Sequence, residues 1–362
     1  MNNNLFQERP LIRASFMQKL SGQKPEENAI IELNNLLATK KIIDISPADI
    51  KEIENRYSLT LSIEFPLNLQ EFYAVYLNDC HCLNPFGASY SPELNHLKQI
   101  LNLDFQTINT IKQKIGSLTY RRNFEKAISN GRLTSIEKES LDKLKEVLQL
   151  TTNIVESISS ETRTKYIENY VARIIEGHRF SPEEEKELNA ISSNLSIQIQ
   201  FSDKTSFQLN KLKLYWKLEN LELPIVICNI DLQKLEVCHF KESNVVWYEP
   251  RGDRQRLSIN PNATSLHIIK SFYLISLSSD IHKLQNDKLK FVDSGTLYLT
   301  NKRIILVGEK KNHNIRIEKI IYHVPLQDGT EICKDSGKSP LLQMTDKADV
   351  FSMIMERILK AM

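Results

Sequence analysis

The chain has 362 residues, of which 41% are hydrophobic and 25% are charged, a balance typical of a folded, soluble protein with two or three domains. The formal net charge is +2: up to Asn210 there are 24 basic and 27 acidic residues, and after it 23 basic and 18 acidic, so the halves carry −3 and +5. This excess is too small to indicate a nucleic-acid-binding chain, but it favours an anionic partner for the C-terminal half.

Three features of the sequence predict a cytoplasmic location. No uninterrupted apolar run reaches the roughly 18 residues expected of a membrane-spanning helix. The chain begins Met1-Asn2-Asn3-Asn4-Leu5, without a basic and then apolar leader. The five cysteines are odd in number and scattered, which suits reduced thiols better than disulfides. We therefore expect a cytoplasmic protein, peripheral at a membrane if its basic residues bind lipid.

One spacing of apolar residues recurs four times within residues 1–200. Each set has steps of three, four and two residues, and successive sets are offset by 44, 47 and 47 residues. The first three positions of a set share one face of a helix, and the fourth lies just past the helix end. The pattern predicts a helical repeat, although leucine-rich helices also produce such matches by chance. The sets are Ile50, Ile53, Tyr57, Leu59; Leu94, Leu97, Leu101, Leu103; Leu141, Leu144, Leu148, Leu150; and Leu188, Ile191, Leu195, Ile197.

Three of these helices should open with a capping serine or threonine and a proline or acidic residue in the first turn. These starts are Ser91-Pro92-Glu93, Thr134-Ser135 and Ser181-Pro182-Glu183. The last two copies also align through the turn before the helix, Asn130-Gly131-Arg132-Leu133-Thr134 with Gly177-His178-Arg179-Phe180-Ser181. Each copy therefore reads as helix, short glycine-containing turn, helix.

These two copies resemble the tellurite-resistance TerB-like helical domain, whose repeats carry a turn of the form D-G-x-h-S/T-x-x-E. The resemblance covers residues 105–200 and follows a separate helical region, residues 1–104. It implies a stress-response role that is linked to a metal. Where the family has acidic residues before the glycine, this chain has Ser129-Asn130 and Ile175-Glu176.

Residues 201–224 are interpreted as a linker or transition. The segment from Gln198 to Phe207 alternates as a strand does, and Leu212 to Trp216 continues the alternation. From Pro224 onward, apolar and β-branched runs predict strands. These runs are 225–228, 236–240, 245–248, 266–269, 272–277 and several after Lys288.

The run Gly295-Thr-Leu-Tyr-Leu-Thr-Asn-Lys-Arg-Ile-Ile predicts two strands joined by a polar turn at Thr300-Asn301-Lys302. Asp328-Gly329 predicts a further tight turn, and a final helix should follow a cap at Asp346. The run, together with the opening Leu232-x-x-x-Glu236-Val237, resembles the GRAM family and the bacterial pleckstrin-homology (PH)-like domains. The resemblance implies that residues 225–362 form a seven-stranded partial barrel closed by a C-terminal helix. The expected fold class is therefore α+β and multidomain. An all-α helical repeat region comes first, and a pleckstrin-like partial barrel with a C-terminal helix follows it.

Catalytic and metal motifs are weak. The turn ending at Glu137 has the spacing of half an EF-hand loop, but Lys126 and Ile128 stand where calcium ligands belong. Cys80-His81-Cys82 lacks a second ligand pair and is expected to be an ordinary loop, and the adjacent Cys238 and His239 would face opposite sides of a strand. Neither a Gly-x-Ser-x-Gly nor a phosphate-loop motif is present. We expect no enzyme activity, no cofactor and no metal.

Basic residues of the predicted β-domain are the stronger indication of function. In pleckstrin-like folds, cations on the loops between strands can hold anionic headgroups. The candidates for anionic ligand binding are Arg251, Arg254, Arg256, Lys310 and Lys311. Protein recognition and a merely solvated face remain alternatives, and Lys302-Arg303 belongs to the family pattern and can serve structure. The sequence thus predicts an adaptor that docks on a protein or an anionic membrane, with no nucleic acid partner, or alternatively the TerB-type stress-response component.

Overall fold

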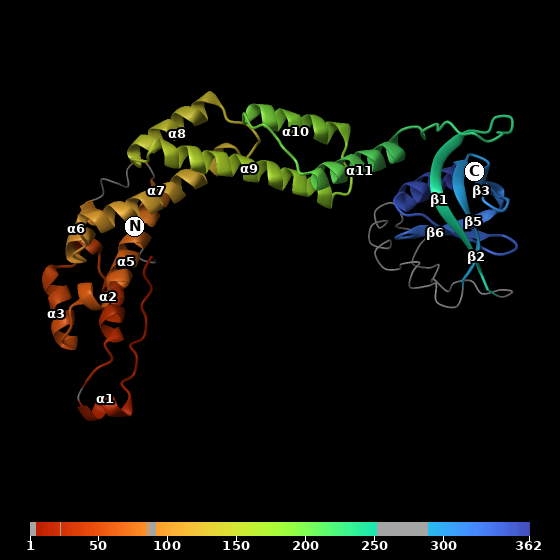
Figure 1. The fold of residues 1–362 in the computed structure, drawn as a ribbon. Helices are drawn as coiled ribbons and strands as arrows, with labels where there is room; N and C mark the ends of the chain where they lie inside the picture. The colour runs from red at the N-terminus through yellow and green to blue at the C-terminus, as the bar shows by residue number, and fades with distance from the viewer. Residues whose placement is uncertain (1–4, 22, 85, 87–91, 252–288) are drawn as a thin grey trace. The chain divides into compact units, whose positions relative to one another are not determined.

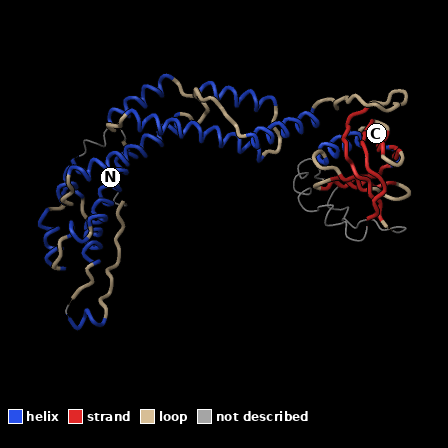
Figure 2. The backbone as a smooth tube through the Cα atoms, in the orientation of Figure 1, coloured by secondary structure: helices blue, strands red, loops and turns tan. Residues whose placement is uncertain are grey.

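The computed structural model describes residues 5–21, 23–84, 86, 92–251 and 289–362. The chain divides into two compact units, Met1–Arg173 with Lys186–Gln200, and Ile174–Glu185 with Phe201–Met362. The first unit is built from helices, and the second contains a sheet followed by a C-terminal helix (Figure 1, Figure 2). The predicted α+β fold class is confirmed.

Helices joined by short connections make up the described part of the first unit (Figure 1). The helices are α1 (Phe16–Ser21), α2 (Glu27–Thr39), a 3-10 turn (Ile42–Asp44), α3 (Pro47–Tyr57), α4 (Leu61–Glu64), α5 (Pro66–Leu83), α6 (Pro92–Ile100), α7 (Phe105–Ala127), α8 (Ser135–Val147), α9 (Thr152–Glu176) and α10 (Pro182–Asn194). The end of α9, from Ile174, and the start of α10, up to Glu185, belong to the second unit.

The four helices of the predicted repeat, α3, α6, α8 and α10, all end in the same way. Each is followed by one residue in the left-handed region, with φ between 48° and 54°. The next residue is the fourth apolar position of its set, and its N–H donates to the carbonyl five residues earlier, as in a Schellman motif. This shared geometry supports the predicted repeat. The left-handed residues are Ser58, Asn102, Gln149 and Ser196.

The predicted helix starts are confirmed where the structure describes them. At α8, Thr134 and Glu137 form a reciprocal capping box, and at α10 Ser181 and Glu184 exchange the same hydrogen bonds. Ser46 caps α3 in this way too, although the sequence analysis did not single it out. The predicted cap at Ser91 lies outside the described residues.

Residues 203–220 form helix α11 (Asp203–Asn220), so the strands predicted for 198–207 and 212–216 are wrong. The hydroxyl of Ser202 caps the helix by accepting from the N–H of Thr205. The buried side chains are Leu209, Leu212, Tyr215 and Leu218, which repeat at helical rather than strand spacing. The stretch predicted as a transition is therefore an ordered helix of the second unit.

Seven antiparallel strands form the sheet of the second unit in the order β4-β3-β2-β1-β7-β6-β5. The two predicted strands at 236–240 and 245–248 are one long strand, and those at 266–269 and 272–277 lie outside the described residues. The segment 225–228 is not a regular strand, although the Val226 N–H donates to the Cys238 carbonyl. The strands are β1 (Cys238–Pro250), β2 (Leu289–Thr300), β3 (Arg303–Gly308), β4 (Asn312–Arg316), β5 (Ile320–Leu326), β6 (Gly329–Lys334) and β7 (Leu341–Gln343).

Strand β1 holds the two halves of the sheet together. It pairs with β2 along most of its length and with β7 at its C-terminal end, and three irregularities in its register bend it. Among the described strands β4 and β5 do not pair with each other, so the sheet is open and does not form a closed barrel. The predicted turns at Asn301-Lys302 and Asp328 are present.

The C-terminal helix α14 (Ala348–Lys360) covers the core of this sheet. Phe351, Ile354 and Met355 are almost fully buried, and the Phe351 ring meets that of Phe240 edge-on, with centroids 5.3 Å apart. The helix begins after Lys347, with no side-chain cap, so the cap predicted at Asp346 is wrong. No helix in the described ranges is long and apolar enough to cross a membrane.

Candidate functional site

The family-like run at 295–305 forms the β2–β3 hairpin, and its apolar and glycine positions have structural roles. Leu297 and Leu299 are fully buried. Gly295 lies opposite Gly308, and a Cβ atom at Gly295 would stand 2.0 Å from the Val307 carbonyl oxygen. Only glycine permits this close approach of the two strands.

The polar residues of the run tie the hairpin to the segment before β1. The buried carboxylate of Glu236 accepts from Arg303 Nε at 2.8 Å and from the Thr300 hydroxyl at 2.7 Å. Asn301 accepts from the Val237 N–H at 2.9 Å, and Lys302 Nζ donates to the Lys234 carbonyl at 2.7 Å. Burial alone would raise the pKa of Glu236, but the hydrogen bonds from Arg303, the Gln233 N–H and Thr300 bring that pKa below its usual value. Lys302 and Arg303 therefore serve the fold.

The β3–β4 hairpin carries Lys310 and Lys311 and is organised by a buried aspartate. Asp293 accepts from the backbone N–H of Ser294 at 2.9 Å, Lys310 at 3.3 Å and Lys311 at 3.2 Å. Nε2 of His313 lies 3.2 Å from the same carboxylate. Burial opposes ionisation, but these donors lower the pKa of Asp293 to about 2. The carboxylate thus fixes the backbone of the hairpin.

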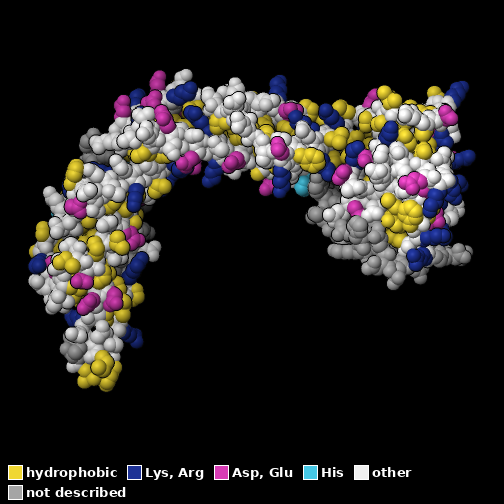
Figure 3. All heavy atoms as spheres, in the orientation of Figure 1, with side chains coloured by type: hydrophobic (Ala, Val, Ile, Leu, Met, Phe, Trp, Pro, Cys, Tyr) yellow, Lys and Arg dark blue, Asp and Glu magenta, His cyan; other side chains and the backbone are white. Residues whose placement is uncertain are grey.

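Lys310 and Lys311 are exposed beside an exposed aromatic ring. Lys310 Nζ lies 4.9 Å from the centroid of Phe291, a cation–π contact, and Phe291 is 46% exposed. Lys290, next to Phe291, is also exposed. We call Lys290, Phe291, Lys310 and Lys311 the basic hairpin patch. Lys and Arg side chains gather along one side of this unit in the space-filling view (Figure 3).

Among the described residues, no contact joins the other predicted anion-binding residues to this patch. Arg251 is exposed directly after β1, next to the pairing of Pro250 with Leu289. Arg254 and Arg256 lie outside the described residues. Sequence reasoning missed Phe291 and Lys290, because Phe291 alternates along β2 as a core residue would. Their position at the strand end, just before the buried Asp293, was the feature that could have indicated them.

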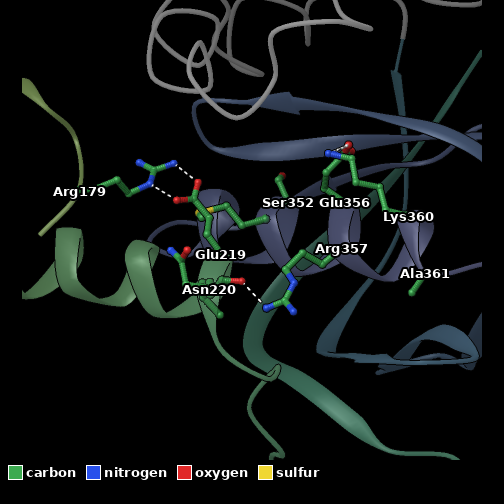
Figure 4. Close-up of a pocket in the computed structure, with 10 residues that line it drawn as sticks. Arg179, Glu219, Asn220, Ser352, Glu356, Arg357, Lys360 and Ala361 are labelled. Atoms are coloured by element: carbon green, nitrogen blue, oxygen red, sulfur yellow. Dashed lines mark hydrogen bonds and ion pairs between the residues drawn. The ribbon is translucent and has the colours of Figure 1, made fainter. Parts of the chain in front are cut away.

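A pocket of about 530 Å³ lies between the C-terminal end of α11 and α14 (Figure 4). Arg179 pairs with Glu219 through two hydrogen bonds, and Arg357 donates to the carbonyls of Leu218 and Leu221. Lys360 Nζ lies 3.0 Å from Glu356. These cations are thus bound to carboxylates or backbone carbonyls at short distances, whereas Lys310 Nζ lies 3.5 Å from the Val292 carbonyl oxygen and against the Phe291 ring. The pocket is therefore a weaker candidate for anion binding than the hairpin patch.

Glu356 carries a strongly shifted pKa at this pocket. His323 Nε2 lies 3.4 Å from its carboxylate. The nearby His323 ring and then Lys360 outweigh burial and lower the pKa of Glu356 to about 2. The carboxylate therefore stays ionised and holds the end of α14 against β5.

Glu331 on β6 is a buried carboxyl group whose pKa is raised to about 7 by burial. Because the unfolded group ionises near pH 4.5, the folded chain binds more protons between these values, and the free energy of unfolding falls as pH rises from about 4.5 to about 7. Glu331→Gln should therefore stabilise the protein at pH 8 by up to about 3 kcal/mol and have no such effect at pH 4. Urea unfolding at both pH values checks this; an equal gain at both would contradict it.

The cysteine and turn candidates have structural explanations. Cys80, His81 and Cys82 lie within α5, so the predicted loop is wrong, and Arg122 donates to Cys82 Sγ at 3.0 Å. Burial raises the pKa of the Cys80 thiol to about 11. Glu137 is engaged in its helix cap. Among the described residues, no three His, Cys, Asp or Glu side chains are placed to share a metal ion.

Residues 67–211 match the model of the Tic110 family, described as a chloroplast envelope transporter. The match covers 145 of 362 residues (67 to 211 inclusive), from α5 into α11, and includes three of the four repeat helices. No curated protein and no solved structure matches the chain.

The family match corrects the predicted location. A chloroplast envelope family points to an organellar envelope and contradicts the cytoplasmic prediction. The prediction rested on scattered cysteines and on the composition of the first residues, and neither feature distinguishes the cytosol from a place at an organellar envelope.

Proposed function

We propose that the protein is a non-enzymatic docking protein and that its C-terminal unit is a GRAM- or PH-like module that binds an anionic membrane surface. The observation that carries this proposal is the basic hairpin patch. There the Lys310 and Lys311 side chains are exposed to pair with lipid headgroups, and the half-exposed Phe291 ring offers an apolar body of the kind enriched at membrane interfaces.

The patch is also held in place before any ligand arrives. Asp293 fixes the backbone N–H groups of Lys310 and Lys311, and the Trp247 ring stacks on His313 with centroids 5.0 Å apart beneath the hairpin. A surface that is already ordered loses less conformational entropy on binding than a flexible loop does. The TerB-type, metal-linked alternative has no comparable support among the described residues.

The proposal is tested by co-sedimentation of the full chain with vesicles of phosphatidylcholine, with and without phosphatidylserine. Wild type should bind the anionic vesicles, and binding should weaken steeply between low and physiological salt. Lys310→Ala with Lys311→Ala should lower the affinity by about thirtyfold at low salt, because each basic residue near an anionic surface contributes about 1 kcal/mol.

The matched control is Lys234→Ala with Lys338→Ala, which removes the same charge from two other exposed positions of the unit. If this control loses as much affinity as the hairpin variant, the binding is diffuse adsorption and the hairpin is not the site. If wild type ignores anionic vesicles at low salt, the membrane proposal fails and a protein partner becomes the better hypothesis.

A further inference from the structure

A second candidate contact surface lies in the first unit, in the segment before α2. Residues 7–12 run beside α2 and are held there by asparagine side chains. Asn35 exchanges two hydrogen bonds with the Arg9 backbone at 2.7 and 2.8 Å, and Asn28 exchanges two with the Ile12 backbone at 2.7 and 2.9 Å. Asn34 donates to the Gln7 carbonyl at 2.7 Å. The buried Phe6 packs edge-on against Phe72.

This anchoring positions α1 at the tip of a projection that we call the N-terminal arm, residues 9–21 and 23–25 (Figure 1). The helix starts in a defined way, since the Ser15 N–H donates to the Gln18 side chain and the Ser15 hydroxyl accepts from the Gln18 N–H. The arm is therefore an ordered feature of the first unit.

The tip exposes large apolar side chains at a density unusual for a surface. Phe16 is 77% exposed, Met17 74% and Leu20 70%, and their spacing of one and four residues places them on one helix face. Leu11 and Ile12, on the strand-like approach to α1, are 48% and 49% exposed. Figure 3 shows hydrophobic side chains gathered at this end of the first unit. Large apolar side chains exposed together in this way indicate a binding surface.

The charge of the arm indicates what covers the patch. Between Glu8 and Glu26 the sequence contains four basic residues and no acidic one: Arg9, Arg13, Lys19 and Lys24. Arg9, Arg13 and Lys24 are exposed. Exposed leucine, phenylalanine and methionine beside charge of a single, positive sign are the composition of segments that lie in the interface of an anionic bilayer. An interface between proteins would favour depletion of charge around the apolar core or a mixture of both signs.

We propose that the N-terminal arm inserts Phe16, Met17 and Leu20 into the headgroup–acyl boundary of an anionic membrane, with its basic residues among the headgroups. This contact is separate from the basic hairpin patch in residues and in chemistry. The hairpin would act mainly through charge, whereas the arm adds burial of apolar side chains, which salt does not screen.

The experiment uses the full chain with Lys310→Ala and Lys311→Ala already introduced, so that the hairpin does not contribute. Co-sedimentation with phosphatidylserine-containing vesicles should show binding that persists in part at physiological salt. Phe16→Ser with Leu20→Ser should lower that binding by at least about tenfold, because two large apolar contacts are lost. The matched control is Phe207→Ser with Leu67→Ser, since those side chains are 73% and 75% exposed elsewhere.

Insertion is read out separately through Phe16→Trp. Its added fluorescence should be quenched by lipids brominated in the acyl chain. Absence of quenching, together with unchanged sedimentation of the Phe16→Ser, Leu20→Ser variant, overturns the proposal. The other partner that could cover the patch is a second copy of the chain, and light scattering tests this by measuring the molecular mass in solution. If wild type is an oligomer and the Phe16→Ser, Leu20→Ser variant is a monomer, the patch joins two copies of the chain and the proposal is wrong. Loss of hairpin binding alone leaves these results unaffected, so the two proposals fail independently.

Discussion

Arg303→Ala is expected to destabilise the C-terminal unit by about 3–5 kcal/mol, because it leaves a buried carboxylate without its cation. The Glu236 side chain has no exposed surface, and Arg303 supplies two of its hydrogen bonds. Urea unfolding followed by the fluorescence of Trp247 in β1 gives the change in the free energy of unfolding.

Two further variants distinguish the loss of the Arg303–Glu236 ion pair from the general effect of shortening an arginine side chain. Glu236→Gln with Arg303→Met removes both charges and should recover part of the lost stability. Arg316→Ala removes an arginine whose pair with Glu318 is mostly exposed, and it should cost less than about 1 kcal/mol. Equal costs for Arg303→Ala and Arg316→Ala would show that the buried pair does not organise the hairpin.

Removal of α11 is expected to have an effect of comparable size on the second unit. Leu218 belongs to the core that includes Phe351 and Ile354, and Tyr215 is 1% exposed and donates to Asp349. Each large apolar side chain buried contributes about 1.5–3 kcal/mol, so a fragment from Pro224 to Met362 should be less stable than one from Phe201 by at least about 3 kcal/mol.

Urea midpoints of the two fragments measure this difference directly, since both lack Ile174–Glu185 and differ only by α11 and the short segments on either side of it. In the longer fragment, Leu218→Ala should be costly, whereas Leu214→Ala, at a side chain that is 39% exposed, should be nearly neutral. Equal midpoints for the two fragments would mean that α11 is dispensable and that the unit folds from Pro224.

Local patterns in the sequence were sufficient for most of the helices and for the hairpin at 295–305. The caps at Thr134 and Ser181 and the left-handed ends of the repeat helices depend on neighbouring residues, which a pattern can reveal. Helix α11 was misread because Leu212, Leu214 and Trp216 alternate as in a strand. The contact that helps fix α11 in the fold joins Tyr215 to Asp349, 134 residues later.

The candidate sites, like the fold, were predicted only where neighbouring residues in the sequence carry the signal. Lys310 and Lys311 were found from their charge alone. The role of Asp293 was hidden because its partners are backbone N–H groups 17 and 18 residues away, which no side-chain pattern records. The N-terminal arm was missed because its apolar residues look like the core of a short helix until their exposure is known.

The position of Asp293 has a consequence for what the hairpin can distinguish. Its carboxylate already occupies the backbone N–H groups of Lys310 and Lys311, the donors that would otherwise grip a phosphate in one fixed orientation. The cations that the hairpin presents to a headgroup are then the ammonium groups of Lys310 and Lys311, and these act as point charges. The affinity of such a surface depends on the amount of negative charge and not on the arrangement of phosphates on an inositol ring. It should therefore rank membranes by charge density and treat isomeric phosphoinositides of equal charge alike.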